Sequence, residues 1–226
     1  MLGGLQKTSL IDYPDKVSAI IFTAGCNFNC HYCYNPELRN YSPKMDEEYF
    51  FSFLKKRKNQ LDAIVVTGGE PTVHSDLPEF ISKIKKLGFL VKLDTQGTNP
   101  EMVKKLIDSK LIDYVAMDIK GPLEKYREIT NCFVNEKAIK ETIKILMTSG
   151  IDYEFRTTIV KDQLILKDFE KIGKLIKGAG KYYLQAFVPN ENLNDKEFSK
   201  RKAPSKKELE AMKNIVSKYV KEVYIR

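Results

Sequence analysis

Long apolar runs are missing from this 226-residue sequence. None approaches the roughly 20 residues that a membrane-spanning helix needs, and the segment Met1–Lys7 lacks the apolar core of a signal peptide. Hydrophobic residues make up 42% of the chain and charged residues 30%, which is ordinary for a folded globular protein and excludes intrinsic disorder. We therefore expect a protein that is neither secreted nor inserted into a membrane.

Tracts that would separate domains are also missing. The sequence shows no internal repeat, no low-complexity tract and no linker rich in proline, glycine or serine. Its length is comfortable for one domain and short for two. The sequence therefore predicts a single domain over residues 1–226. The least regular stretch is the polar segment from Pro189 to Pro204, which we expect to form a loop over one face.

Positive charge is in excess but spread out. Lysine and arginine number 38 against 30 aspartates and glutamates, a formal net charge of +8. The lysines recur on predicted helix faces, and basic runs such as residues 55–58 are short and have no series of aromatic residues beside them. We interpret the charge as a solvated shell and expect no direct contact with nucleic acid. It would suit an acidic protein partner.

Cysteine is scarce, and three of the four residues are clustered. Cys26, Cys30 and Cys33 fall within eight residues, and Cys132 stands far downstream. A secreted disulfide scaffold would spread its cysteines, so this cluster indicates a metal or redox site. Three thiolates can hold three irons of a cubane cluster and leave the fourth iron open, whereas structural zinc needs four ligands. We expect His31 to be a solvated loop residue and Cys132 to be an ordinary half-buried thiol.

Short apolar runs rich in β-branched residues alternate with amphipathic helices. The sequence predicts six strands buried on both faces, at residues 17–23, 63–67, 90–94, 114–118, 155–160 and 182–187. Alternation at about 30 residues per unit indicates parallel βα units and an α/β fold class. Six such units form part of a barrel, and a doubly wound open sheet is the alternative.

Helix starts are marked by capping residues. Asp76 precedes an amphipathic segment and is predicted to cap it, and helices are predicted to start at Asp46 and at Asn99, which Pro100 follows. Ser205 and Glu208 have the spacing of a capping box and predict a C-terminal helix.

Polar motifs follow four successive predicted strands, at the carboxyl ends where ligands bind in parallel α/β folds. They are the cysteine loop, the segment Thr67-Gly68-Gly69-Glu70-Pro71, the pair Asp94-Thr95, and Asp118-Ile119-Lys120. The two glycines let the backbone approach a ligand closely, and Glu70 supplies an acceptor for a cation. The other two motifs place two carboxylates and an ammonium at the same opening. A tight turn and helix capping are the alternative interpretations.

The spacing C-x3-C-x2-C, with the aromatic Tyr32 before the third cysteine, resembles the radical S-adenosylmethionine (SAM) superfamily. This resemblance implies a partial (β/α)6 TIM-like barrel of parallel strands with a C-terminal helix. It also implies a [4Fe-4S] cluster on Cys26, Cys30 and Cys33, whose open iron is chelated by the amino and carboxylate groups of SAM. Tyr32 would lie near the adenine.

The same resemblance assigns roles to the other motifs. The segment Gly68-Gly69-Glu70 would meet the SAM ammonium, and Arg156 in the fifth predicted strand would reach SAM. Asp94, Thr95 and Asp118 would be ligands of SAM or of a monovalent cation. Lys120 would be a catalytic, polar residue of the active site.

The segment before the first predicted strand narrows the resemblance. Residues 4–14, GLQKTSLIDYP, are similar to the same region of anaerobic ribonucleoside-triphosphate reductase activating proteins, which belong to the glycyl-radical-enzyme activating family. Residues 22–27 and 35–38 share this similarity. Asp12 matches an aspartate that contacts the substrate peptide in the related pyruvate formate-lyase activating enzyme. Tyr34 departs from the pattern, because the family often has histidine there.

The resemblance implies a radical SAM oxidoreductase that activates a glycyl-radical enzyme, with anaerobic ribonucleotide reductase as the expected partner. It would cleave SAM reductively to a 5′-deoxyadenosyl radical, which takes a hydrogen atom from a glycine of the partner. An electron donor such as flavodoxin or ferredoxin would supply the electron. Alternatives are an activase of another glycyl-radical enzyme such as pyruvate formate-lyase, a radical SAM enzyme that acts on a small molecule, and a non-enzymatic iron–sulfur or zinc module with four protein ligands.

Overall fold

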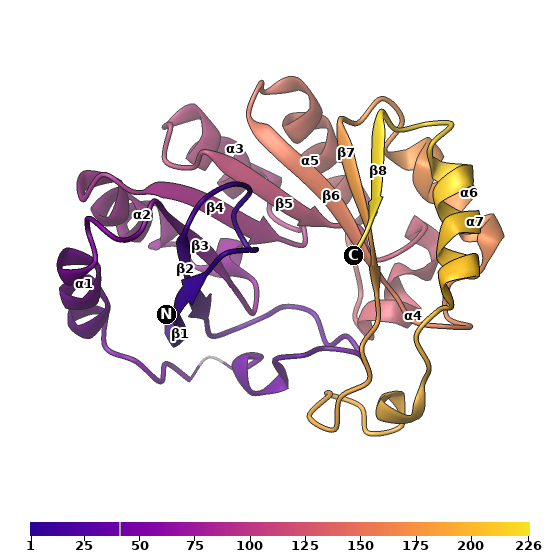
Figure 1. The fold of residues 1–226 in the computed structure, drawn as a ribbon, viewed down its shortest axis with the longest axis horizontal. Helices are drawn as coiled ribbons and strands as arrows, with labels where there is room; N and C mark the ends of the chain where they lie inside the picture. Colours follow the sequence, from indigo (N-terminus) through magenta and orange to yellow (C-terminus); the bar gives the residue numbers. More distant parts are fainter. Residues whose placement is uncertain (41) are drawn as a thin grey trace. The chain divides into compact units, whose positions relative to one another are not determined.

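The strands form one sheet whose spatial order follows the order of the chain (Figure 1). The structure, a computed structural model, describes residues 1–40 and 42–226. In this part of the chain the strands are β1 (Leu2–Ser9), β2 (Ser18–Thr23), β3 (Ala63–Gly68), β4 (Leu90–Thr95), β5 (Tyr114–Asp118), β6 (Asp152–Ile159), β7 (Lys181–Ala186) and β8 (Glu222–Ile225). All six predicted strands are confirmed, as β2 to β7.

The fold class is confirmed as α/β with an open sheet of mostly parallel strands, a partial barrel. Strands β2, β3 and β4 pair in parallel, as do β6, β7 and β8. A doubly wound sheet would reverse its strand order at a switch point, and the sequential order β1 to β8 rules that alternative out.

Two strands were not predicted from the sequence. Strand β1 pairs antiparallel with β2, and its glycines and exposed polar residues hide the alternation that marks a strand. Strand β8 has four residues and pairs in parallel with β7.

The helices mostly begin where the capping residues predict. They are α1 (Glu47–Lys56), α2 (Leu77–Lys86), α3 (Pro100–Asp108), α4 (Tyr126–Thr130), α5 (Glu136–Thr148), α6 (Leu166–Leu175) and α7 (Lys206–Val216). Asp46 accepts a hydrogen bond from the Glu48 amide, and Asn99 accepts one from the Met102 amide. The capping box of Ser205 at α7 is also present. The prediction for Asp76 is wrong in one respect: it occupies the N-cap of α2, but its side chain makes no capping hydrogen bond.

Internal contacts divide the chain into two compact units. The first unit comprises residues 1–27, 37–95 and 99–116, and the second comprises residues 28–36, 96–98 and 117–226. In the first unit, α1, α2 and α3 cover one face of the strands (Figure 1). In the second, α6 packs against α7, and α7 packs against β8. The single domain over residues 1–226 stays a prediction.

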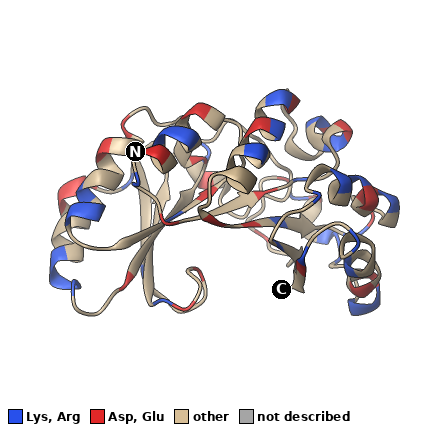
Figure 2. Cartoon of the chain, turned by 90° about the horizontal axis from the view of Figure 1, so that it is seen from above, with Lys and Arg blue, Asp and Glu red and all other residues tan. Residues whose placement is uncertain are grey.

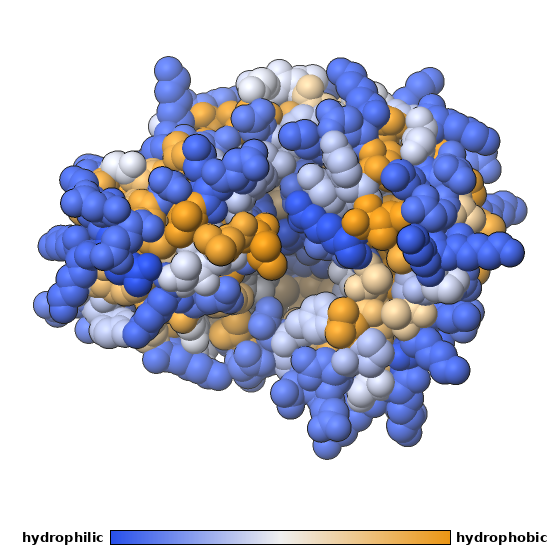
Figure 3. Space-filling model, viewed as in Figure 1, coloured by the Kyte–Doolittle hydropathy of each residue, from blue (hydrophilic) through white to orange (hydrophobic). Residues whose placement is uncertain are grey.

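Charged side chains of both signs share the surface. Figure 2 shows lysine and arginine on the helices together with aspartate and glutamate, and the face seen in Figure 3 is mostly hydrophilic, with small groups of hydrophobic residues. Lys83 pairs with Glu47 and Lys174 with Glu170 across such helix surfaces. In the residues that the structure describes, no helix has the length and apolar character needed to cross a membrane.

Candidate functional site

The cysteine loop begins in the first unit, directly after β2. The Gly25 amide donates to the Leu38 carbonyl at 2.6 Å, and the Cys26 amide donates to the Arg39 carbonyl at 3.1 Å. The ring of His74 donates from Nε2 to the Ala24 carbonyl at 2.8 Å. The backbone around Cys26 is therefore fixed from two sides. Sequence reasoning missed His74, although it is one of only two histidines and follows the Gly-Gly-Glu segment closely.

The Gly68-Gly69 pair at the end of β3 packs against this part of the loop. Gly68 has a φ of +115°, a backbone conformation that residues other than glycine rarely adopt. A Cβ atom on Gly69 would lie 2.1 Å from the Gly25 carbonyl oxygen, and the Glu70 amide donates to that same oxygen at 2.8 Å. The structure thus brings two of the predicted motifs, the glycine segment and the start of the cysteine loop, into backbone contact.

Replacing Gly69 with alanine is expected to destabilise the chain, because the added methyl group would collide with backbone that cannot rotate away. Overpacking of this kind costs about 1–3 kcal/mol, or roughly 2–12 °C in melting temperature for a chain of this size. Gly180→Ala is the matched control, since a Cβ there meets no atom within 4 Å. Thermal unfolding followed by circular dichroism measures both. Equal melting temperatures for the two variants would contradict the packing described.

Glu70 is buried in a hydrogen-bond network that joins β3 to β4. Its Oε1 atom accepts from the Thr72 amide at 3.1 Å, the Thr72 hydroxyl at 2.5 Å and the Thr95 hydroxyl at 2.6 Å. Both Glu70 and Thr95 are almost fully buried. The network brings together two residues that the sequence singled out, and Thr72 adds a third that it missed.

Lys92 connects two further predicted residues in the first unit. Its ammonium lies 3.4 Å from the Asp94 carboxylate and donates to the Asp12 carbonyl oxygen at 2.5 Å. The Asp12 carboxylate itself accepts from the Ser9 hydroxyl, which closes a short turn. Next to Asp12, the apolar Ile11 is 83% exposed. Lys92 was missed because a lone lysine inside a strand carries no motif.

The second half of the cysteine loop lies in the second unit. The Cys33 amide donates to the Cys30 carbonyl at 3.1 Å, and the Asn29 amide donates to the Thr130 carbonyl at 2.9 Å. Burial raises the pKa of the Cys30 thiol to about 11, opposed by the positive charge of Lys120. All four cysteines lie in the described part of the chain, and there all four are thiols rather than disulfides.

Tyr32 is buried between the last two cysteines of the loop. Its hydroxyl has no hydrogen-bond partner in the described part of the chain, and burial raises its pKa far above the usual range. The Lys120 ammonium lies 6.0 Å from the centre of its ring. A buried hydroxyl without a partner is costly, so this position fits a site that is completed by a bound group.

Asp118, Lys120 and Arg156 form a compact charged triad in the second unit. The Asp118 carboxylate accepts from Lys120 Nζ at 2.8 Å and from Arg156 Nε at 2.5 Å. Burial alone would raise the pKa of Asp118, but the Arg156 guanidinium and the Lys120 ammonium hold it well below its usual range. Burial opposes the Lys120 charge, but Asp118 raises the pKa of Lys120 well above its ordinary value. The triad therefore joins two cationic groups to one carboxylate.

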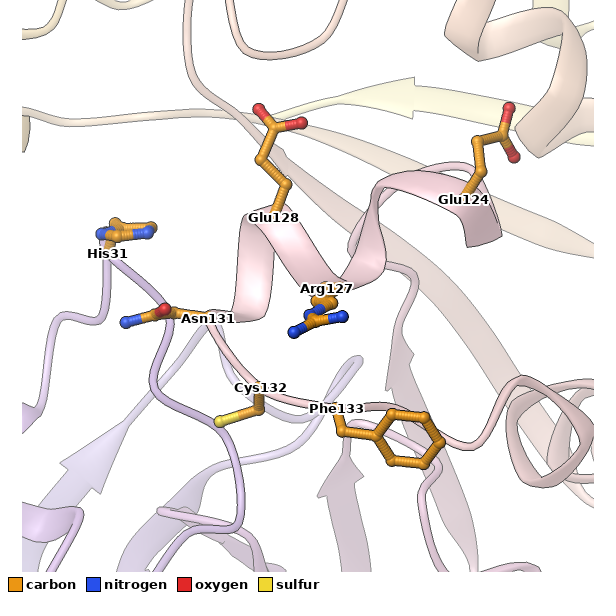
Figure 4. Close-up of a pocket in the computed structure, with 7 residues that line it drawn as sticks. All are labelled: His31, Glu124, Arg127, Glu128, Asn131, Cys132 and Phe133. Atoms are coloured by element: carbon orange, nitrogen blue, oxygen red, sulfur yellow. The ribbon is translucent and has the colours of Figure 1, made fainter.

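The structure corrects the expectation for His31 and confirms that for Cys132. His31 is not a solvated loop residue: its ring pairs with Asp195 at 3.0 Å and stacks on Phe198 at 5.1 Å. Cys132 is half-buried, as predicted, and it helps line an open pocket of about 710 Å³ beside α4 (Figure 4). The pocket is lined by His31, Glu124, Arg127, Glu128, Asn131, Cys132 and Phe133.

The donor chemistry fits an iron–sulfur cluster with an open iron. The three thiols are close in sequence, and Cys26 belongs to the first unit whereas Cys30 and Cys33 belong to the second. Among the described residues, no group of three or more histidine, cysteine, aspartate or glutamate side chains is placed so that it could hold a metal ion, so the assignment of the three cysteines rests on their chemistry and their spacing in the sequence. Three thiolates are what a cubane cluster requires when its fourth iron binds another ligand.

Residues 20–176 match the model of the radical SAM superfamily. This covers most of the chain and includes all the motifs at the strand ends. Members of the superfamily use a [4Fe-4S] cluster and S-adenosylmethionine.

Relatives define the family more closely. The chain is 38% identical to a candidate glycyl-radical enzyme activating enzyme of Methanocaldococcus jannaschii, over 100% of this chain and 95% of that protein. It is 25% identical to the pyruvate formate-lyase-activating enzyme of Clostridium pasteurianum, over 97% and 96% of the two chains. The chain therefore belongs to the radical SAM superfamily and, within it, to the glycyl-radical enzyme activating enzymes. Such enzymes act on a glycyl-radical enzyme as partner.

Solved structures share the fold. A domain of the pyruvate-formate lyase-activating enzyme from Bacteroides vulgatus superposes with a TM-score of 0.54 at 17% identity, over 73% of this chain and 98% of that one. SuiB of Streptococcus suis, bound to S-adenosylmethionine, gives a TM-score of 0.69 at 14% identity, over 92% and 49%.

Proposed function

We propose that Cys26, Cys30 and Cys33 hold the [4Fe-4S] cluster and that the chain installs a glycyl radical on an anaerobic ribonucleoside-triphosphate reductase. The observation that carries the proposal is the contact of Gly69 and the Glu70 amide with the backbone at Gly25 and Cys26. It joins the motif proposed for SAM to the loop proposed for the cluster. The similarity of residues 4–14 to activating proteins of this reductase supports the choice of partner.

The remaining strand-end residues are proposed to bind and orient SAM. In the first unit, Gly68, Gly69, Glu70, Asp94 and Thr95 present backbone groups and two carboxylates, which suit the SAM ammonium or a monovalent cation. The Glu70–Thr95 hydrogen bond keeps these groups in fixed positions.

In the second unit, Lys120 and Arg156, both hydrogen-bonded to Asp118, are cationic donors of the kind that suits a carboxylate. Tyr32 is proposed to lie beside the adenine, where its buried ring offers an apolar face.

When bound, the cluster and SAM supply the one-electron cleavage that produces methionine and a 5′-deoxyadenosyl radical. The task of the chain is to position the bound groups and to exclude water from them. Lys120 is proposed as a catalytic residue because its charge lies close to both Tyr32 and Cys30. Asp12 is proposed to orient the glycine-bearing peptide, from a turn that Ser9 and Lys92 hold in place.

The electron is proposed to come from a flavodoxin or ferredoxin in an anaerobic cytoplasm. A cluster with one open iron reacts with oxygen, so an anaerobic setting would protect it. Pyruvate formate-lyase is the alternative partner, because its activating enzyme is 25% identical to this chain over nearly its whole length.

The test is electron paramagnetic resonance after the reduced, reconstituted chain is mixed with SAM and each candidate partner. We expect release of 5′-deoxyadenosine and a glycyl doublet on the ribonucleotide reductase, and no doublet on a reductase whose radical-bearing glycine is replaced by alanine. A doublet only on pyruvate formate-lyase would overturn the choice of partner. Deoxyadenosine without a doublet on any partner would favour a small-molecule substrate, and intact SAM would refute the proposal.

A further inference from the structure

The segment of residues 187–198, here called the strap, runs from the end of β7 along the second half of the cysteine loop. It contacts the loop first at Tyr34. The Val188 amide donates to the Tyr34 hydroxyl at 2.8 Å, and the Phe187 and Tyr34 rings stack at 6.1 Å. Tyr34 thus anchors one end of the strap to the residue that follows the last cysteine.

Asn194 makes the densest set of contacts between the strap and the loop. Its side-chain amide donates to the Asn29 side-chain oxygen at 2.7 Å, to the Cys30 carbonyl at 3.1 Å and to the Asn29 carbonyl at 3.4 Å. Its backbone amide donates to the Cys33 carbonyl at 3.4 Å. One residue therefore holds the backbone carbonyls of two cysteines.

The next residues of the strap hold the loop between those cysteines. The Asp195 amide donates to the His31 carbonyl at 3.1 Å, and its carboxylate pairs with the His31 ring at 3.0 Å. The Phe198 ring stacks on His31 with an angle of 10° between the planes. The carbonyls of Cys30, His31 and Cys33 are all directed at the strap.

These contacts have two physical consequences for a bound cluster. A cluster with three thiolates carries negative charge, and carbonyl oxygens turned toward it would destabilise it. Groups that orient metal ligands from behind commonly change metal affinity 10–100-fold when they are removed. A loop that is already ordered also loses less conformational entropy when it binds.

We infer that Asn194 is a positioning residue, which fixes the Cys30–Cys33 half of the loop and slows the loss of the cluster. The inference rests on the proposed role of the three cysteines. It deepens that role, because Asn194 lies far from them in sequence and belongs to no motif. The polar segment from Pro189 to Pro204, expected to be a loop over one face, thereby gains a defined task.

The test compares Asn194→Ala with Asn192→Ala, the same substitution at an exposed position of the strap. In the chain without iron, we expect amide hydrogen exchange of residues 29–34 to be faster in Asn194→Ala alone, with an unchanged melting temperature. In the anaerobically reconstituted chain, release of iron to a chelator should be about tenfold faster, the ratio that corresponds to about 1.4 kcal/mol. Asn194→Asp, which cannot donate to the Cys30 carbonyl, should release iron at least as fast.

The outcomes separate this inference from the proposed function. If the wild-type chain holds its irons and Asn194→Ala releases them at the rate of Asn192→Ala, Asn194 does not position the cluster, whatever happens to its hydrogen exchange. Such a result would leave the cysteine assignment intact. If the wild-type chain holds no cluster after reconstitution, the cysteine assignment fails, and with it the role of Asn194 in cluster retention. The amide hydrogen exchange of residues 29–34 would then show only whether Asn194 orders the loop.

Discussion

Alanine at any one of Cys26, Cys30 or Cys33 is expected to abolish the [4Fe-4S] cluster. The reconstituted wild-type chain should carry about four irons, and each single variant should retain less than about a tenth of that amount. Two thiolates leave two irons without protein ligands, so an exposed cluster breaks down. Iron and sulfide analysis, together with the absorbance of the reconstituted protein, measures the effect.

Cys132→Ala is the control for this experiment. Cys132 is half-buried and lies near enough to Cys30 to contribute to the raised pKa of the Cys30 thiol. It is therefore the remaining thiol that could act as a fourth ligand. We expect this variant to keep its irons. If it loses the cluster as completely as Cys30→Ala does, four protein ligands are needed, and the site is a closed iron–sulfur module rather than one with an open iron.

The parallel sheet could be predicted because its strands are buried on both faces. Runs such as residues 63–67 and 114–118 are apolar up to their last residue, and the structure has them as β3 and β5 with almost the same bounds. Strand β1 could not be found in this way, because Gly3, Gly4 and the exposed Gln6 and Lys7 give it no alternating pattern. Its place is set by pairing with β2, which is a long-range property.

The same contrast holds for the candidate site. Residues that belong to a motif, such as Glu70 and Asp118, were found because a strand end followed by polar residues is visible in the sequence. Residues that support them were not, because His74 and Asn194 act through backbone carbonyls of distant residues. Every residue has a backbone carbonyl, so the residue that accepts such a hydrogen bond can be of any type, and no sequence motif marks the contact. Only the folded chain shows which carbonyl each donor reaches.

Asp118→Asn is expected to lower the free energy of unfolding by about 2–3 kcal/mol at neutral pH. Removing one partner of a buried ion pair costs about 3–5 kcal/mol, and the lower figure applies because the Asp118 side chain is 29% exposed. The neutral amide has one acceptor oxygen in place of two charged ones, so the ion pairs with Lys120 and Arg156 are both lost. Asp152→Asn, an exposed position at the start of β6, is the control and should change the stability by less than about 0.5 kcal/mol.

The difference between the wild-type chain and Asp118→Asn should depend on pH in a defined direction. The pKa of Asp118 is lower in the folded chain than its ordinary value of 3.8, so its stabilising effect is complete above that value and is lost as the pH falls through the folded pKa. The raised pKa of Lys120 keeps its own effect complete below 10.5. Urea unfolding should therefore give a constant difference from about pH 5 to pH 9 and a smaller one below about pH 3.8. A difference that disappears near pH 6 would contradict the ion pairs.

A double-mutant cycle decides whether Asp118 acts through its contacts with the cations or through packing. Arg156→Met removes the shorter of the two contacts while it keeps most of the side-chain volume. If the contact carries the stability, the combined variant Asp118→Asn/Arg156→Met should be less destabilised than the sum of the two single variants, by about 1–2 kcal/mol. Additive losses would instead mean that the two residues stabilise the chain independently. The geometry favours coupling, because Asp118 binds a different cation through each carboxylate oxygen. When either Asp118 or Arg156 is replaced by a neutral residue, the ion pair between them is already lost, so the second substitution costs less.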